Sequence, residues 1–251
     1  MSSARVLFLD ILTDNAELRR ELNKKIHFGK RYQELIRQKI KAPIDYFRVV
    51  EASSGELPDM DDFDMLIMGG SVEDPVPCKE KKWMKRVYKF IRTTISSKKP
   101  IFGICGGLQF TVRALGGQII YNPKSREFGT VQIRLTPRGQ KDYLFDNMPL
   151  CFPVQSSHKY MVAPLLKRGW SILATSALCS VQAIAIGENI RLVQFHPELG
   201  PSNMKALAKM RRTALQKEGI FKEKTFVEFL ESIRSAKAAE RLINNFIRNF
   251  T

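Results

Sequence analysis

Short apolar runs alternate with longer segments in which apolar residues recur at helical spacing. Four runs of large aliphatic and β-branched residues predict strands at residues 6–10, 46–50, 65–68 and 101–104. Between these runs, helices are predicted over residues 14–40 with a break at Gly29, over about 79–97, and from Gly106 to Leu115. Strands that alternate with helices in this way favour a mostly parallel sheet with helices on both faces.

The pattern changes in the second half of the chain. Short apolar runs separated by turns predict six more strands, at residues 118–121, 130–135, 151–155, 171–174, 182–186 and 191–195. Their close spacing favours an antiparallel region beside the parallel core. Beyond Pro197 the chain is predicted to be helical. We therefore expect one α/β domain over residues 1–200 and a helical C-terminal extension over residues 201–251, packed on or beside it.

The predicted extension carries its own apolar positions. They are Phe226, Phe229, Leu230, Ile233, Leu242, Ile243, Phe246 and Ile247. Such positions on a helix either pack on the chain's own sheet or form a docking surface for a partner or a second copy. The sequence leaves both alternatives open, and with them the oligomeric state.

Composition and charge narrow the class of protein. The chain has 251 residues, of which 44% are apolar, and this is enough for a full hydrophobic core. No apolar run approaches the length of a membrane span, and the N-terminus leads into a strand rather than a signal peptide, so we expect a cytoplasmic protein. The net charge of +16 would attract polyanions, but it is spread along the chain without a nucleic-acid motif. We expect neither a membrane nor a nucleic-acid partner.

The cysteines show no pairing or metal-ligand spacing, so we expect free thiols and no metal site. Cys151 and Cys179 lie in apolar surroundings and are predicted to be small buried residues. Cys105 differs, because it stands at a predicted strand-to-helix junction between Gly103 and Gly107. This Gly-x-Cys-x-Gly layout is typical of a nucleophile elbow, a sharp turn that side chains on its flanks would obstruct. The N-terminus of the helix would stabilise a thiolate there.

A cysteine nucleophile needs a base and a group that orients the base. Of the three histidines, His196 follows an apolar strand in the segment Phe195-His196-Pro197-Glu198. Residues i and i+2 of an extended chain project to the same side, so Glu198 is placed to orient the imidazole. Cys105, His196 and Glu198 therefore predict a catalytic triad.

The two other histidines have weaker signals. His27 lies in a charged segment and is predicted to be a surface residue. His158 lies near a strand end. Its role stays open between a purely structural one, support of a loop near the site, and contact with a partner.

These motifs resemble those of class I glutamine amidotransferases of the triad type. Residues 103–109 match the family pattern Gly-Ile-Cys-x-Gly-x-Gln, residues 195–198 match Phe-His-Pro-Glu, and Gly69-Gly70 supplies the expected turn after the third strand. The likeness covers roughly residues 4–200. Segments 125–129 and 156–159 resemble the GMP synthase amidotransferase domain and its stand-alone relatives. Lys159-Tyr160 replaces the usual Gly-Asp of that branch, and Ser71 replaces a common proline.

The resemblance implies a flavodoxin-like fold of three layers, αβα, without a cofactor. It also implies a reaction in which Cys105 attacks the side-chain amide carbon of glutamine and forms a glutamyl thioester. His196 would transfer the protons and release ammonia, and Glu198 would fix the imidazole tautomer. Water would then hydrolyse the thioester to glutamate.

Four further residues receive roles from the same resemblance. The backbone N–H groups of Gly70 and Gly106 would face the developing oxyanion. Gln109 lies one helical turn beyond Cys105 and would hold the amino-acid end of the substrate. Glu127 is a second candidate for that task, with a solvated loop carboxylate as the alternative.

Three functions stay open. The first is an amidotransferase subunit or stand-alone glutaminase, whose ammonia would pass to a synthase on another chain because no synthase domain is evident here. The second is a hydrolase that cleaves γ-glutamyl bonds in a conjugate or peptide with the same triad. The third is a non-catalytic binding protein with this fold, against which the intact triad argues. The sequence does not identify the ammonia acceptor.

Overall fold

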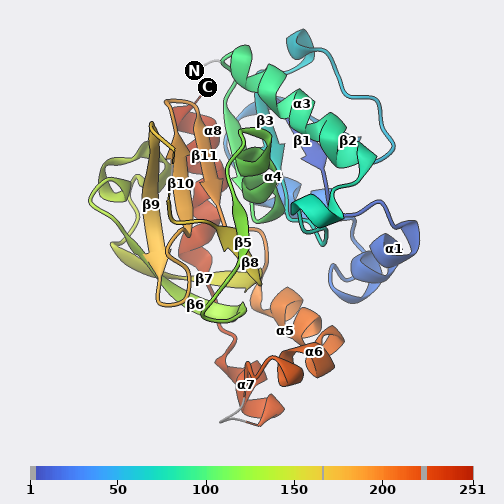
Figure 1. The fold of residues 1–251 in the computed structure, drawn as a ribbon, viewed down its shortest axis with the longest axis vertical. Coiled ribbons are helices and arrows are strands. Elements are labelled where there is room, and N and C mark those ends of the chain that lie inside the picture. Colours follow the sequence, from blue (N-terminus) through green and yellow to red (C-terminus); the bar gives the residue numbers. More distant parts are fainter. Residues whose placement is uncertain (1–3, 166, 222–224, 251) are drawn as a thin grey trace.

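A nine-stranded sheet forms the centre of the protein in the computed structural model, which describes residues 4–165, 167–221 and 225–250 (Figure 1). The order of its strands is β2-β1-β3-β4-β11-β10-β9-β6-β7. Their bounds are β1 (Ala4–Asp10), β2 (Ile44–Glu51), β3 (Met65–Met68), β4 (Ile101–Ile104), β6 (Glu127–Leu135), β7 (Cys151–His158), β9 (Trp170–Ser176), β10 (Ala183–Ile186) and β11 (Ile190–Val193).

The sheet has a parallel half and an antiparallel half. Strands β2, β1, β3, β4 and β11 pair in parallel, and the pairs from β11 through β10, β9 and β6 to β7 are antiparallel. The predicted antiparallel region is therefore continuous with the parallel core, and β11 joins the two halves. A separate two-stranded sheet pairs β5 (Ile119–Tyr121) with β8 (Tyr160–Val162). Strand β8 was not predicted from the sequence; it follows β7 after the single residue Lys159, with no turn residue to separate the two strands.

Eight helices are described. They are α1 (Ala16–Lys25), α2 (Tyr32–Lys39), α3 (Lys82–Ser96), α4 (Gly106–Ala114), α5 (Pro201–Met210), α6 (Arg212–Lys217), α7 (Phe226–Ser232) and α8 (Arg241–Asn249). The predicted break at Gly29 lies between α1 and α2, where the residue has φ of +83°. No helix in the described ranges has the length and apolar character that crossing a membrane requires.

The helices cover both faces of the sheet and give three layers. On one face α3 and α4 pack on the sheet, and the α3 residues with the expected helical spacing are buried: Trp83, Val87, Phe90 and Ile91. On the other face α2 and α8 meet a second hydrophobic cluster. The predicted α/β architecture with helices on both faces is confirmed.

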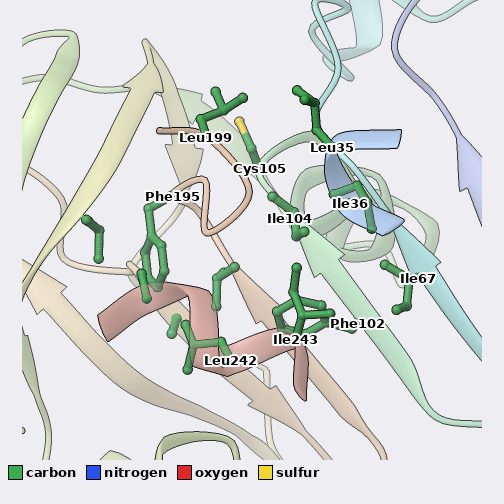
Figure 2. Close-up of a cluster of buried hydrophobic side chains, with 14 of the residues drawn as sticks. Leu35, Ile36, Ile67, Phe102, Ile104, Cys105, Phe195, Leu199, Leu242 and Ile243 are labelled. Carbon is green, nitrogen blue, oxygen red and sulfur yellow. The ribbon is translucent and has the colours of Figure 1, made fainter. Parts of the chain in front are cut away.

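Helix α8 belongs to the core of the sheet rather than to a free surface. Leu242, Ile243, Phe246 and Ile247 are all buried, and the Phe246 ring stacks on Phe102 of β4 at 5.2 Å between centroids. Figure 2 shows Leu242 and Ile243 of α8 in the same cluster as Phe102 and Ile104, with Cys105 at the end of β4. The sequence left two alternatives open for these four α8 residues. In the structure they pack on the chain's own sheet and do not form a free docking surface.

The segment between Pro201 and α8 lies beside the carboxyl ends of the parallel strands. Phe229 of α7 is buried and its ring lies 6.2 Å from that of Phe128 in β6. Val227 on the same helix is 63% exposed. The part of the extension formed by residues 222–224 and 251 lies outside the described residues, and its predicted helical structure stays a prediction.

Candidate active site

Cys105 occupies a strained turn between β4 and α4. Its backbone has φ of +49° and ψ of −96°, a region that residues other than glycine rarely adopt. A Cβ atom on Gly103 would lie 2.7 Å from the backbone carbonyl carbon of Gly107, which is too close. Glycine at this position therefore lets β4 and α4 pack directly against each other. The sharp turn that the glycine pattern predicts is therefore present, and it places the thiol at the carboxyl edge of the sheet.

The pairing of β11 with β4 brings the predicted base to this turn. Val193 pairs with Ile104, so the segment after β11 leaves the sheet beside Cys105. His196 and Cys105 line the same cavity, and Nδ1 of His196 lies 2.6 Å from Oε1 of Glu198. The imidazole is 9% exposed and Glu198 is 1% exposed. The structure thus brings together all three members of the predicted triad.

Charge on both sides of the ring favours the imidazolium form of His196. Burial alone would lower its pKa, but the Glu198 carboxylate and the Cys105 thiolate raise the pKa to about 10. A ring held between an anion that orients it and a sulfur nucleophile can accept a proton from the thiol and later donate it to a leaving amine.

The raised pKa of His196 predicts a stability change with pH. A histidine whose pKa rises on folding contributes stability that is complete below its unfolded pKa of 6.5 and is lost as the pH rises through about 10. We therefore expect the free energy of unfolding of the wild type to fall over this window relative to that of His196→Gln. Urea unfolding of both proteins at pH 6, 8 and 10 measures the difference. Parallel curves for the two proteins would contradict this electrostatic account.

Tyr32, at the start of α2, completes the hydrogen bonding around Glu198. Its hydroxyl donates to Oε1 of Glu198 at 2.8 Å and accepts the backbone N–H of Gly70 at 2.6 Å. Burial raises the pKa of Tyr32 well above its usual value, so the hydroxyl remains a donor. The N–H of Gly70, one of the two groups expected to face the oxyanion, thus donates to the phenol oxygen of Tyr32 in this structure. Tyr32 was not predicted as a site residue, because no sequence motif marks it.

Two glutamine side chains form a hydrogen-bonded chain that ends at the thiol of Cys105. Gln109 is 5% exposed and its Nε2 donates to the backbone oxygen of Tyr160 at 3.2 Å and to Oε1 of Gln194 at 3.3 Å. Gln194 in turn donates from Nε2 to Sγ of Cys105 at 3.6 Å. Gln194 was not predicted as a site residue, although its position two residues before His196 on an extended segment places both side chains on the same side.

Glu127 contacts His158, which lies directly opposite it in the β6–β7 pair. Nε2 of His158 lies 3.1 Å from Oε2 of Glu127, and Nδ1 lies 3.0 Å from the backbone oxygen of Tyr160. Burial on its own would raise the pKa of Glu127, but hydrogen bonds from His158, Ser176 and Ser156 lower it below its usual value. Glu127 is buried behind His158 and does not line the cavity next to Cys105, whereas His158 does. Glu127 therefore orients His158 in this structure.

A cavity of about 320 Å³ opens beside Cys105. The triad residues, Gly70, Gln109 and His158 line it, whereas Gly106 lies at the first position of α4 and does not. His27 also lines it and is 4% exposed, so the prediction of a surface histidine is wrong.

The position of His27 has a local cause. The turn at Gly29 folds the end of α1 toward α2, and the imidazole stacks on the Tyr32 ring at 5.3 Å between centroids. Burial lowers the pKa of His27 to about 4, so this ring is neutral near pH 7. It contributes packing rather than charge to the cavity.

Cationic side chains gather at the side of the cavity formed by β7 and the α5–α6 corner. Arg211 donates from Nη1 to Oγ of Ser157 at 3.2 Å, and within the described residues no carboxylate lies at ion-pair distance from it. Burial, with the neighbouring Arg126, lowers the pKa of Arg211 from its usual value. Arg126 is paired with Glu218, and Lys159 lies 3.8 Å from Asp74. Arg211 is therefore the guanidinium in this group that is placed to receive a carboxylate.

Comparison with known proteins places the chain in a family. The family model "Glutamine amidotransferase class-I" matches residues 26–211. γ-Glutamyl peptidase 3 of Arabidopsis thaliana is 27% identical over 157 residues, which are 61% of this chain and 62% of that protein. The glutamine-hydrolysing GMP synthase of Aquifex aeolicus is 28% identical over 69% of this chain and 32% of its own length. A subunit of the glutamine-hydrolysing GMP synthase of Methanococcus aeolicus is 40% identical over 42% of this chain and 54% of its own length. The chain thus spans less than two thirds of each of these relatives.

Solved structures show the same fold. A glutamine amidotransferase from Thermotoga maritima superposes with a TM-score of 0.72 at 17% identity, covering 98% of this chain and 97% of that one. One from Methylobacillus flagellatus gives 0.72 at 19% identity, covering 100% and 96%. The flavodoxin-like architecture expected from the sequence motifs is therefore confirmed.

Proposed function

Because the chain belongs to the class-I glutamine amidotransferase family, we propose that it hydrolyses the side-chain amide of glutamine through a thioester on Cys105. The observation that carries this proposal is that Cys105, His196 and Glu198 line one cavity, with Nδ1 of His196 in hydrogen-bonding contact with Glu198. Each of the three groups has the neighbour that its proposed role requires.

The proposed reaction begins with the thiolate of Cys105 and the imidazolium of His196. The sulfur attacks the amide carbon, and the carbonyl oxygen becomes an oxyanion next to the backbone N–H groups of Gly70 and Gly106. His196 donates its proton to the nitrogen as the C–N bond breaks, and ammonia leaves. A water molecule then gives a proton to His196 and attacks the thioester, which restores the thiol and releases glutamate.

Specific side chains support the proposed binding of the amino-acid end. His158 and Gln109 line the cavity on the β7–β8 side, where their orientation is set by Glu127 and Gln194. In this proposal Gln109 and the neighbouring backbone hold the α-amino and α-carboxylate groups, and Glu127 acts through His158. Ammonia released here would pass to a synthase on a partner chain, an arrangement in line with the Methanococcus aeolicus relative, which is named as one subunit of a GMP synthase.

One observation favours a second candidate, hydrolysis of γ-glutamyl peptides. Arg211 borders the same cavity without a carboxylate partner in the described chain, although a partly buried guanidinium is stabilised by one. The carboxylate of a residue joined to the γ-glutamyl group would supply it. Among the relatives, two are named γ-glutamyl peptidases.

A comparison of substrates separates the two candidates. Glutamate release is measured with glutamine, γ-glutamylglycine and γ-glutamylmethylamide, the last of which has no carboxylate on its leaving group. If the peptide is a substrate through Arg211, Arg211→Gln should lower kcat/KM for γ-glutamylglycine about 10-fold or more while changing that for the methylamide little. Preference for glutamine over both compounds, with no effect of Arg211→Gln, would leave glutaminase as the function. No release from any of the three would reject both candidates.

A further inference from the structure

The hydroxyl of Tyr32 joins two parts of the site that are far apart in the sequence. It donates to Oε1 of Glu198, the same oxygen that faces Nδ1 of His196, and it accepts the N–H of Gly70. The second carboxylate oxygen of Glu198 is buried and has no hydrogen-bond partner among the described residues. His196 and Tyr32 therefore both donate to the same oxygen of this carboxylate, Oε1, and together they compensate its charge.

The tyrosine ring is fixed on several sides. It is 3% exposed, stacks on His27, and makes an edge contact with Phe8 of β1 at 6.1 Å between centroids. A Cβ atom on Gly69 would lie 2.4 Å from Cε1 of the tyrosine. The glycine turn after β3 therefore lies directly against the Tyr32 ring, and the ring and the turn constrain each other.

The Gly69-Gly70 turn is held at two points: the backbone oxygen of Gly69 accepts the N–H of Gly107 at 3.0 Å, and the N–H of Gly70 donates to the Tyr32 hydroxyl. Neither residue has a side chain, and a Cβ on Gly70 would lie 2.8 Å from Cε1 of His196, so the site excludes one. Glycine backbone is the most adaptable in proteins, and an amide without an acceptor could rotate out of position. The hydrogen bond to the Tyr32 hydroxyl is what directs the Gly70 N–H to the cavity wall in the described structure.

We propose that Tyr32 is a positioning residue, whose hydroxyl anchors the Gly70 amide to Glu198 and holds this N–H at the cavity wall, where a developing oxyanion would share it with the phenol oxygen. This inference rests on the proposed amide hydrolysis for its catalytic meaning, but its structural part does not. No bond to Tyr32 forms or breaks in the reaction, and the hydroxyl continues to donate to Glu198.

The developing oxyanion is the stronger of the two acceptors because of its charge. The phenol oxygen is a neutral acceptor, whereas the oxyanion carries a full negative charge, and hydrogen bonds to ionised acceptors are roughly twice as strong. The ground-state amide oxygen of the substrate is neutral and has no such advantage over the phenol. The Gly70 N–H would therefore contribute mainly in the transition state, which is where a contribution accelerates the reaction.

The test compares Tyr32→Phe with Tyr88→Phe. Both variants keep a buried aromatic ring and lose one hydroxyl, and Tyr88 belongs to α3 on the opposite face of the sheet. For Tyr32→Phe we expect kcat for glutamine to fall on the order of tenfold or more with KM nearly unchanged, because the oxyanion donor loses its alignment. Tyr88→Phe should retain wild-type kcat and KM.

Two NMR measurements need no substrate. Hydrogen exchange of the Gly70 amide should become faster in Tyr32→Phe, because the amide loses its acceptor. The Nδ1 proton of His196 should move downfield, because Oε1 of Glu198 then accepts from His196 alone. Both signals should be unchanged in Tyr88→Phe.

The outcomes separate this inference from the proposed function. If the wild type hydrolyses no glutamine, the function fails, and unchanged exchange at Gly70 in Tyr32→Phe would independently overturn the anchoring role. If the wild type is active, a kcat of Tyr32→Phe within twofold of the wild type would overturn it as well. A higher kcat in Tyr32→Phe would mean that the hydroxyl blocks the Gly70 amide instead of positioning it, which is also a refutation.

Discussion

Replacing Cys105 with alanine is expected to lower kcat/KM for glutamine by about 10⁴-fold or more, because removal of the nucleophile leaves only binding and oxyanion stabilisation. The measurement is glutamate release by purified protein at matched concentrations. Alanine retains the Cβ and fits the same backbone, so the variant should fold with the wild-type unfolding midpoint. The loss of activity can be assigned to the missing thiol only if the variant is shown to be folded.

Cys151→Ala is the matched control for this experiment. Cys151 is a half-buried free cysteine at the start of β7 and does not line the cavity, so we expect wild-type activity. Cys179 is buried, as expected from the sequence, whereas Cys151 is less buried than expected. Substantial hydrolysis by Cys105→Ala, or an equal loss in both variants, would contradict the assignment of Cys105 as nucleophile.

Replacing Phe246 with alanine is expected to lower the free energy of unfolding by about 3–5 kcal/mol, the range for a fully buried phenylalanine. Phe246 has no exposed surface and stacks on Phe102, which belongs to the strand that carries Cys105. The loss would include both buried area and a cavity against the sheet. Urea unfolding followed by circular dichroism measures it.

Val227→Ala on α7 serves as the control for Phe246→Ala. Val227 is 63% exposed, and surface substitutions of this kind usually change stability by less than about 0.5 kcal/mol. A small effect of Phe246→Ala would mean that α8 is dispensable for the core and would support a docking role for its apolar face. A large effect means that α8 cannot be removed without damage to the sheet.

The strand-to-helix turn at Cys105 could be predicted from the sequence because its causes are local. An apolar strand, two flanking glycines and a following helix are all visible within residues 101–115. The pairing of His196 with Glu198 was equally local, since the two are separated by one proline in an extended segment. That His196 and Glu198 lie beside Cys105 could not be predicted from local sequence and was inferred from the two family motifs. The register of β11 with β4 explains this proximity.

Residues whose roles depend on packing between distant segments could not be found in this way. Tyr32 and His27 belong to a charged region that the sequence predicts as helical, and the turn at Gly29 brings their rings together beside the cavity. Glu127 was predicted to be a substrate ligand or a solvated carboxylate, and in the structure it is buried against side chains of two other strands, Ser156 and His158 of β7 and Ser176 of β9. Such clusters leave no periodic signal, because their members are brought together by sheet order alone.

The most direct test of the proposed chemistry is to locate the covalent bond. A glutamine analogue with a chloroketone in place of the side-chain amide is incubated with the wild-type protein, and the modified peptide is identified by mass spectrometry. Attachment at Cys105, prevented by excess glutamine, is the predicted result. Attachment at another cysteine, or none at Cys105 in a protein that hydrolyses glutamine, would contradict it.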